Sequence, residues 1–190
     1  MLYSPVISPG NRFIKNNFNT MNLKKGFLFI ISLSILSLGA RAQNERIKAL
    51  FIYNFTKYIE WPAAYKQGDF IIAVVGETAV FDQLVTNTAT RKVATQSIVV
   101  KKYNKPKEVE RCNILYMAHD KAGTIKEAVE RIKDWNTLLI TDSAPSGNLE
   151  FGLNFVNTEG KQTFEVNTSF LDQKKLGYNQ ELLRLGVKVK

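Results

Sequence analysis

The sequence is short of the residue types that most catalytic and metal sites require. Its 190 residues include one cysteine, Cys112, and one histidine, His119. No H-E-x-x-H helix, C-x-x-C pair, G-x-S-x-G turn or pair of carboxylates at a spacing useful for catalysis occurs. These absences argue against the common zinc, thiol and serine enzymes. We therefore expect a protein that is not an enzyme and that has no metal site and no cofactor.

A single cysteine also excludes a disulfide within the chain. A chain without a disulfide must be stabilised by its hydrophobic core alone. Cys112 comes just before the apolar run 114–117. A reactive thiol needs an accessible, electropositive site, so we expect Cys112 to be buried and inert.

The chain has no apolar run long enough to span a bilayer. Residues 26–39 are largely apolar but number about fourteen, fewer than the roughly 18 that a spanning helix needs. They follow the basic segment 21–25 and precede an A-x-A cleavage site that ends at Ala42, so residues 21–42 are predicted to be a signal peptide. The alternative is an uncleaved anchor. Residues 1–20 have no recognisable targeting role, so we expect Met21 to be the true start and the upstream segment to be an over-extended reading frame.

Much of the positive charge belongs to this leader. Residues 1–42 hold five basic and no acidic residues, so cleavage lowers the formal net charge from +9 to +4. A nucleic-acid partner is therefore not expected. We expect the mature protein in the periplasm or secreted, without stable membrane insertion.

The remaining chain alternates strand-like and helix-like segments. Residues 70–76 form a continuous apolar run, which is typical of a strand covered on both faces. Gly76 ends this run without companion glycines, so a G-x-G-x-x-G nucleotide site is absent. Further strands are expected at residues 96–103, 113–118 and 137–142, with helices opening at Thr78 and over residues 121–135. This order predicts an α/β fold, a single three-layer domain with a mainly parallel sheet flanked by helices.

The C-terminal part has a different pattern. Residues 149–157 and 162–167 are strand-like and are separated by a turn containing Gly160, which predicts an antiparallel hairpin. A helix is expected to begin at Asn167, with Gly177 as its C′ residue. A short helix over residues 181–186 is expected to dock on the core.

Residues 47–59 are predicted to form a helix that is apolar around most of its circumference. One stripe at helical spacing consists of Ile47, Leu50, Phe51, Phe55 and Tyr58. Trp61 and the proline after it end the helix. Four apolar residues outside the stripe are candidates for a partner-binding surface: Ile52, Tyr53, Ile59 and Trp61. The alternative is that they pack under the sheet or the hairpin.

Three further residues lie at or just past the carboxyl ends of predicted strands, namely Gly76, His119 and Asp142. Because the carboxyl ends of parallel strands share one edge of a sheet, these residues are candidates for a ligand crevice. The alternative is that they are solvated loop residues or helix caps.

The segment 51–62, F-I-Y-N-F-T-K-Y-I-E-W-P, resembles the opening signature of the YfiR family. These are small exported proteins that regulate membrane-bound diguanylate cyclases from the periplasm. Residues 111–116, 137–142, 163–167 and 181–186 also resemble sequence motifs of this family. Asn113 stands where the family often has histidine, which weakens any metal role there. The resemblance implies a YfiR-like domain over residues 43–190.

The resemblance also implies a function. It predicts a non-enzymatic regulator that binds the extracytoplasmic part of a membrane signalling protein, either a diguanylate cyclase or a sensor kinase, and so acts on cyclic di-GMP signalling. The alternative is a periplasmic small-molecule sensor. The sequence does not identify the partner, and it leaves a homodimer open.

Overall fold

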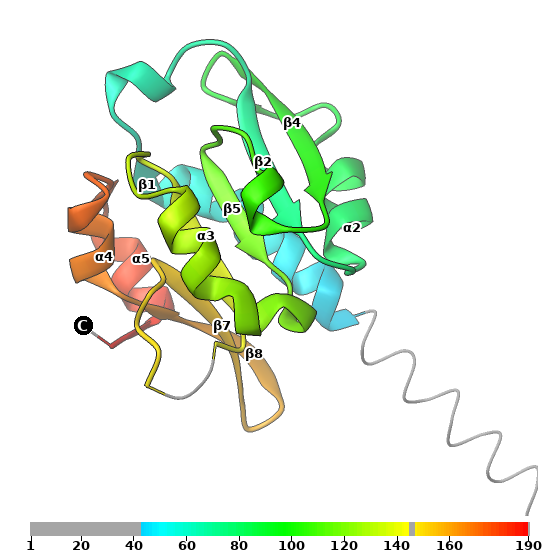
Figure 1. Ribbon diagram of the computed structural model, residues 1–190, viewed down its shortest axis with the longest axis vertical. Helices are drawn as coiled ribbons and strands as arrows, with labels where there is room; N and C mark the ends of the chain where they lie inside the picture. The colour runs from blue at the N-terminus through cyan, green and yellow to red at the C-terminus, as the bar shows by residue number, and fades with distance from the viewer. Residues whose placement is uncertain (1–42, 145–146, 190) are drawn as a thin grey trace, which may run out of the picture. The chain divides into compact units, whose positions relative to one another are not determined.

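The computed structural model describes residues 43–144 and 147–189, and the predicted leader lies outside these residues. They form an α/β domain built on one large sheet (Figure 1). The helices are an N-terminal helix over residues 43–58, α2 (Val80–Thr88), α3 (Ile125–Arg131), α4 (Thr168–Gln173) and α5 (Gln180–Leu185), with 3-10 turns at η1 (Ala63–Tyr65), η2 (Pro106–Glu108) and η3 (His119–Thr124). The strands are β1 (Ile59–Glu60), β2 (Phe70–Val75), β3 (Lys92–Val93), β4 (Gln96–Tyr103), β5 (Ile114–Met117), β6 (Leu138–Asp142), β7 (Leu153–Thr158), β8 (Lys161–Val166), β9 (Gly177–Tyr178) and β10 (Val187–Lys188).

The eight-stranded sheet has the order β10-β8-β7-β6-β5-β2-β4-β3. Its five central strands β4, β2, β5, β6 and β7 are parallel. β8 returns antiparallel to β7 and forms the C-terminal hairpin, and the short β3 lies antiparallel to β4 at the edge. The predicted fold class, a mainly parallel sheet with helices and a C-terminal hairpin, is confirmed.

Both faces of the central sheet are covered. Along β2, Ile72 and Val74 belong to one buried cluster, while Ala73 and Val75 belong to another, because successive side chains of a strand point to opposite faces. The N-terminal helix and α2 contribute to the first cluster, and α3 contributes to the second. Figure 1 shows α3 in front of the sheet and the N-terminal helix behind it. The domain is therefore three-layered.

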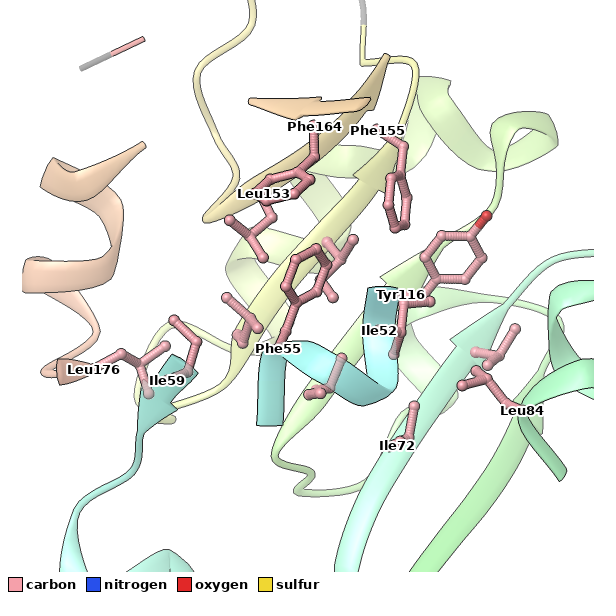
Figure 2. Close-up of a cluster of buried hydrophobic side chains, with 14 of the residues drawn as sticks. Ile52, Phe55, Ile59, Ile72, Leu84, Tyr116, Leu153, Phe155, Phe164 and Leu176 are labelled. Atoms are coloured by element: carbon pink, nitrogen blue, oxygen red, sulfur yellow. The ribbon is translucent and has the colours of Figure 1, made fainter. Parts of the chain in front are cut away.

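The buried stripe of the N-terminal helix differs from the predicted one. The fully buried apolar residues are Ala49, Ile52 and Phe55, whereas Leu50 is 37% exposed. Phe55 packs edge-on against Phe164, with ring centroids 4.9 Å apart (Figure 2). The stripe is rotated because apolar residues surround most of the helix, so contacts with distant aromatic rings of the hairpin decide which face turns inward.

The end of α4 also differs from the prediction. The residue with left-handed backbone is Lys175, at a φ of 53°, and not Gly177. Gly177 instead pairs with Glu60 in the two-stranded sheet β1-β9. A Cβ at this position would touch the Glu60 side chain, so close approach of two strands accounts for the glycine.

Cys112 is 1% exposed, and burial raises its pKa to about 12. Because the thiolate is the reactive form, we expect a thiol reagent to modify native protein far more slowly than protein unfolded in denaturant. Cys112→Ser should cost only about 1 kcal/mol of unfolding free energy. The measurement is a labelling time course with and without denaturant. Rapid, stoichiometric labelling of the native protein would contradict this expectation.

Candidate functional site

The carboxyl ends of β2, β5 and β6 meet the first turns of the N-terminal helix, and a pocket of about 530 Å³ lies between them. The N-terminal helix contributes Glu45 and Lys48 to its wall, and the loop after β2 contributes Thr78. His119 follows β5, and Asp142 is the last residue of β6. The pocket therefore combines four segments that are distant in sequence.

The topology places the pocket where an open parallel sheet usually binds ligands. From β2 the chain first passes to β4 on one side and then crosses to β5 on the other. The strand order thus reverses at β2, and the helices that follow β2 and β5, α2 and α3, pack on opposite faces of the sheet. Crevices at such a switch point are the usual ligand sites of doubly wound sheets.

A buried charge network forms the inner wall of the pocket. The Lys48 ammonium donates a hydrogen bond to Asp142 Oδ2 at 2.7 Å and another to Glu45 Oε1 at 3.0 Å. The Tyr116 hydroxyl donates to the same Asp142 oxygen at 3.0 Å. Thr78, which also accepts a hydrogen bond from the Val80 backbone, donates its hydroxyl proton to Glu45 Oε2 at 2.5 Å. The network ties the N-terminal helix to two strands and to the start of α2.

The protonation of the network follows from this arrangement. Burial alone lowers the pKa of Lys48, but the hydrogen bonds and the attraction of Asp142 and Glu45 outweigh it, so this pKa is raised above its ordinary value. Burial, followed by the negative charges of Asp142 and Glu45, raises the pKa of Tyr116 well above its ordinary value. Near neutral pH the ammonium is therefore charged and the phenol is neutral.

The structure brings two of the three predicted crevice residues to the pocket wall. His119 Nδ1 lies 3.4 Å from the backbone oxygen of Asp142, and both residues line the pocket. Gly76 lies just before the lining residues 77–79 and has a φ of 107°. A Cβ there would collide with the side chains of Asp120 and Lys121, so Gly76 permits the loops after β2 and β5 to approach each other.

Sequence reasoning did not identify Glu45, Lys48 or Tyr116 as site residues. Two features of the sequence could have indicated the first two. Glu45 and Lys48 are an i, i+3 pair of opposite charges, and Lys48 lies beside the buried stripe of an otherwise apolar helix. A lysine at such a position requires a buried partner. The partner, Asp142, is 94 residues away and cannot be assigned from local pattern.

Three of the four residues expected to face a partner belong to the core. Ile52 is 0% exposed, and Ile59 and Trp61 are each 5% exposed. The indole N–H of Trp61 donates to the backbone oxygen of Asn113 at 3.1 Å, and its ring packs edge-on against Phe70. The three are therefore wrong as candidates for a partner-binding surface, and the alternative, that they pack in the core, holds for them.

Tyr53 alone of the four remains partly exposed. The Arg91 guanidinium lies 4.4 Å from the centre of its ring, and the Lys57 ammonium lies 5.0 Å from it. Leu50 and Lys57 share this face of the helix at i−3 and i+4. We call Leu50, Tyr53 and Lys57 the outer face of the N-terminal helix.

Asn113 has a structural role. Its side-chain oxygen accepts a hydrogen bond from the Ile71 backbone at 2.9 Å, and its amide donates to the backbone oxygen of Tyr65 at 3.3 Å. Across residues 43–144 and 147–189, no three histidine, cysteine, aspartate or glutamate side chains come together as a metal site. Within the same ranges, no helix combines the length and apolar character needed to cross a membrane.

Comparison with known proteins gives one family match. A search of curated proteins finds no match to the chain. The family model described as YfiR/HmsC-like matches residues 45–187, which include every strand and helix discussed above except the last strand's final residue and the first two residues of the N-terminal helix. The chain belongs to the YfiR/HmsC-like family.

Proposed function

We propose that the protein is an exported regulator that binds the extracytoplasmic part of a membrane signalling protein. The observation that carries the proposal is the family match over residues 45–187. Membership of this family suggests a periplasmic regulator of diguanylate cyclase signalling. In this proposal residues 21–42 direct export, and the described domain acts by binding rather than by chemistry.

The charged groups of the pocket support a role in binding. Lys48 forms ion pairs with both Asp142 and Glu45, and the Tyr116 phenol is held neutral by burial and by the adjacent carboxylates. Such groups can position a ligand or fix a conformation. A general base or nucleophile needs instead a perturbed group that is free to react.

The outer face of the N-terminal helix is the surface we propose for the partner. Leu50 is 37% exposed, and the partly exposed Tyr53 has two cationic side chains over its ring, those of Lys57 and Arg91. Tyrosine and arginine are enriched where protein interfaces concentrate their binding energy. The two cations favour a partner surface that carries carboxylates.

The test is a pull-down against the extracytoplasmic domain of a membrane cyclase or kinase encoded beside this gene. We expect the purified protein to retain this domain on a column, and deletion of the gene to change the cellular level of cyclic di-GMP. Binding should weaken as salt is raised, since cations contribute to it. Failure to bind any neighbouring membrane protein, with cyclic di-GMP unchanged on deletion, would contradict the proposal.

A second candidate function is small-molecule sensing through the pocket. Its volume of about 530 Å³ lies within the range of roughly 300–1,000 Å³ that is usual for ligand pockets, and it lies at the topological switch point. The test is a fragment screen by proton NMR. Because His119 is the chain's sole histidine and lines the pocket, its imidazole resonances report on binding there without assignment of other signals.

A further inference from the structure

One oxygen of Asp142 is left without a partner at the pocket. Asp142 is 6% exposed and lines the pocket. Its Oδ2 accepts hydrogen bonds from both Lys48 and Tyr116. Among the described residues, no group donates a hydrogen bond to Oδ1. Oδ1 is not one of the buried side-chain atoms that lack a partner in the described part of the chain, so it is accessible at the pocket and can accept a hydrogen bond from a donor outside the chain.

The charge of the inner wall favours a cationic donor. Two carboxylates, those of Glu45 and Asp142, share the single ammonium of Lys48. Both oxygens of Glu45 are occupied, one by Lys48 and the other by Thr78. One negative charge is therefore uncompensated, and the free acceptor that accompanies it is Asp142 Oδ1.

The acidic residues at the rim do not explain this excess. Glu77 forms an ion pair with Lys102 at 2.8 Å, and Asp120 lies 3.4 Å from the Lys121 ammonium. Both rim carboxylates are thus compensated by cations at the surface. The uncompensated charge belongs to the interior of the pocket, where water screens it least.

Ser143 supplies a neutral polar group beside this charge. It follows Asp142, lines the pocket, and has a φ of 59°. Its backbone N–H donates to Phe155 at 2.9 Å, while no hydrogen bond joins its hydroxyl to another described residue. Left-handed backbone at a residue other than glycine is strained and often accompanies binding sites. The hydroxyl is available to a polar group next to a ligand's charge.

We propose that the pocket binds a small ligand that carries a protonated amine, with its ammonium bonded to Asp142 Oδ1. The inference rests on the second candidate function and adds the chemical class of the ligand. The ammonium supplies the missing donor and neutralises the unpaired charge in one contact. An anionic ligand would instead add a like charge to a wall that already has an excess carboxylate.

The experiment follows the His119 resonances of the full chain during titration with n-butylamine, butanol and butyrate. These probes have the same carbon chain and differ in charge. We expect a saturable shift with butylamine near neutral pH, where the amine is protonated, and little or no shift with the other two. Equal shifts with butanol or butyrate would contradict specificity for a protonated amine, although they would still support a ligand-binding pocket. No shift with butylamine would also overturn the inference.

Variants then locate the contact. Asp142→Asn keeps the shape of the side chain and removes its charge, so the Kd for butylamine should weaken about tenfold or more, as expected for loss of a hydrogen bond to a charged group. Glu110→Gln is the matched control, because Glu110 forms an exposed ion pair with Lys101 in the segment that precedes β5, away from the pocket lining. It should bind butylamine as the wild type does. An unchanged Kd in Asp142→Asn would overturn the inference.

If Asp142→Asn does not fold, Glu45→Gln provides the same test, because it removes the other carboxylate and cancels the net negative charge of the wall. Butylamine binding should then also weaken, and unchanged binding would overturn the inference. The readout is independent of any partner protein. A positive titration would support the pocket whatever the outcome of the pull-down, so failure of this inference and failure of the regulator proposal are distinguishable.

Discussion

Replacement of Ile52 by aspartate is expected to unfold the domain. Ile52 is 0% exposed and belongs to the buried cluster between the N-terminal helix and the sheet (Figure 2). The variant would place an unpaired carboxylate in this cluster, at a cost of several kcal/mol even after the group becomes protonated. The whole unfolding free energy of such a domain is about 5–15 kcal/mol. The measurements are circular dichroism melting and urea unfolding, and a melting temperature within a few degrees of the wild type would contradict the burial of Ile52.

Tyr53→Asp is the matched variant, one residue further along the helix. Tyr53 is partly exposed, and the change removes its contacts with Arg91 and Lys57. Those contacts are worth about 0.5–1 kcal/mol each at an exposed site, so the fold should survive. Binding of the membrane partner should be lost, because the variant puts a like charge opposite the acidic surface that we propose for that partner. Full binding by a folded Tyr53→Asp protein would remove the outer face as the interface.

These two variants also mark where sequence reasoning succeeded and where it failed. The strand at residues 70–76 was predictable because a continuous apolar run between polar segments has few other structures available. The Trp61-Pro62 pair sets the limit of the helix by local backbone chemistry, but the helix ends earlier, at Tyr58, because residues 59–60 pair with β9. Local rules of this kind account for most of the fold.

The orientation of the N-terminal helix was not predictable by the same means. Its apolar residues define two overlapping stripes, and the sequence favours the one through Leu50 and Phe51. The native choice is set by contacts across more than a hundred residues, such as that between Phe55 and Phe164. The burial of Ile52, Ile59 and Trp61 follows from that choice, so the sequence alone could not decide between a surface role and a core role for them.

In the pocket, too, some residues could be placed from local sequence pattern and others depend on distant contacts. His119 and Asp142 could be placed at one edge of the sheet because they lie at the carboxyl ends of parallel strands. The contributions of Lys48 and Tyr116 depend on the helix crossing the sheet at one particular angle, so that the Lys48 ammonium reaches Asp142 at 2.7 Å. No periodicity in the sequence specifies that angle.

The variant Lys48→Met, which removes the ion pair with Asp142, is expected to have the second large effect on stability. Methionine matches much of the volume of the lysine stem but removes the ammonium, leaving Asp142 and Glu45 close together without a cation. Breaking a buried ion pair from one side costs about 3–5 kcal/mol, because the remaining charge stays buried. We expect a fall of that order in the unfolding free energy, measured by urea unfolding. Lys101→Met, in an exposed ion pair with Glu110, is the control and should change stability little.

The double variant Lys48→Met/Asp142→Asn separates loss of the pair from loss of packing. Because it removes both charges, it should be more stable than Lys48→Met alone, with a coupling of about 0.5–3 kcal/mol. Strict additivity of the two single changes would show that Lys48 and Asp142 do not interact energetically.

The difference in unfolding free energy between the wild type and Lys48→Met should depend on pH in a defined direction. The pKa of Lys48 is raised in the folded protein above its ordinary value of 10.5, so folding favours the protonated form. Its contribution is therefore fully present below about pH 10.5 and is lost as the pH rises through the higher folded value. The difference in unfolding free energy between wild type and Lys48→Met should stay constant from pH 7 to 9 and shrink only above about pH 10.5. A difference that already disappears between pH 7 and 9 would mean that the ammonium of Lys48 does not bind the carboxylates as the structure places it.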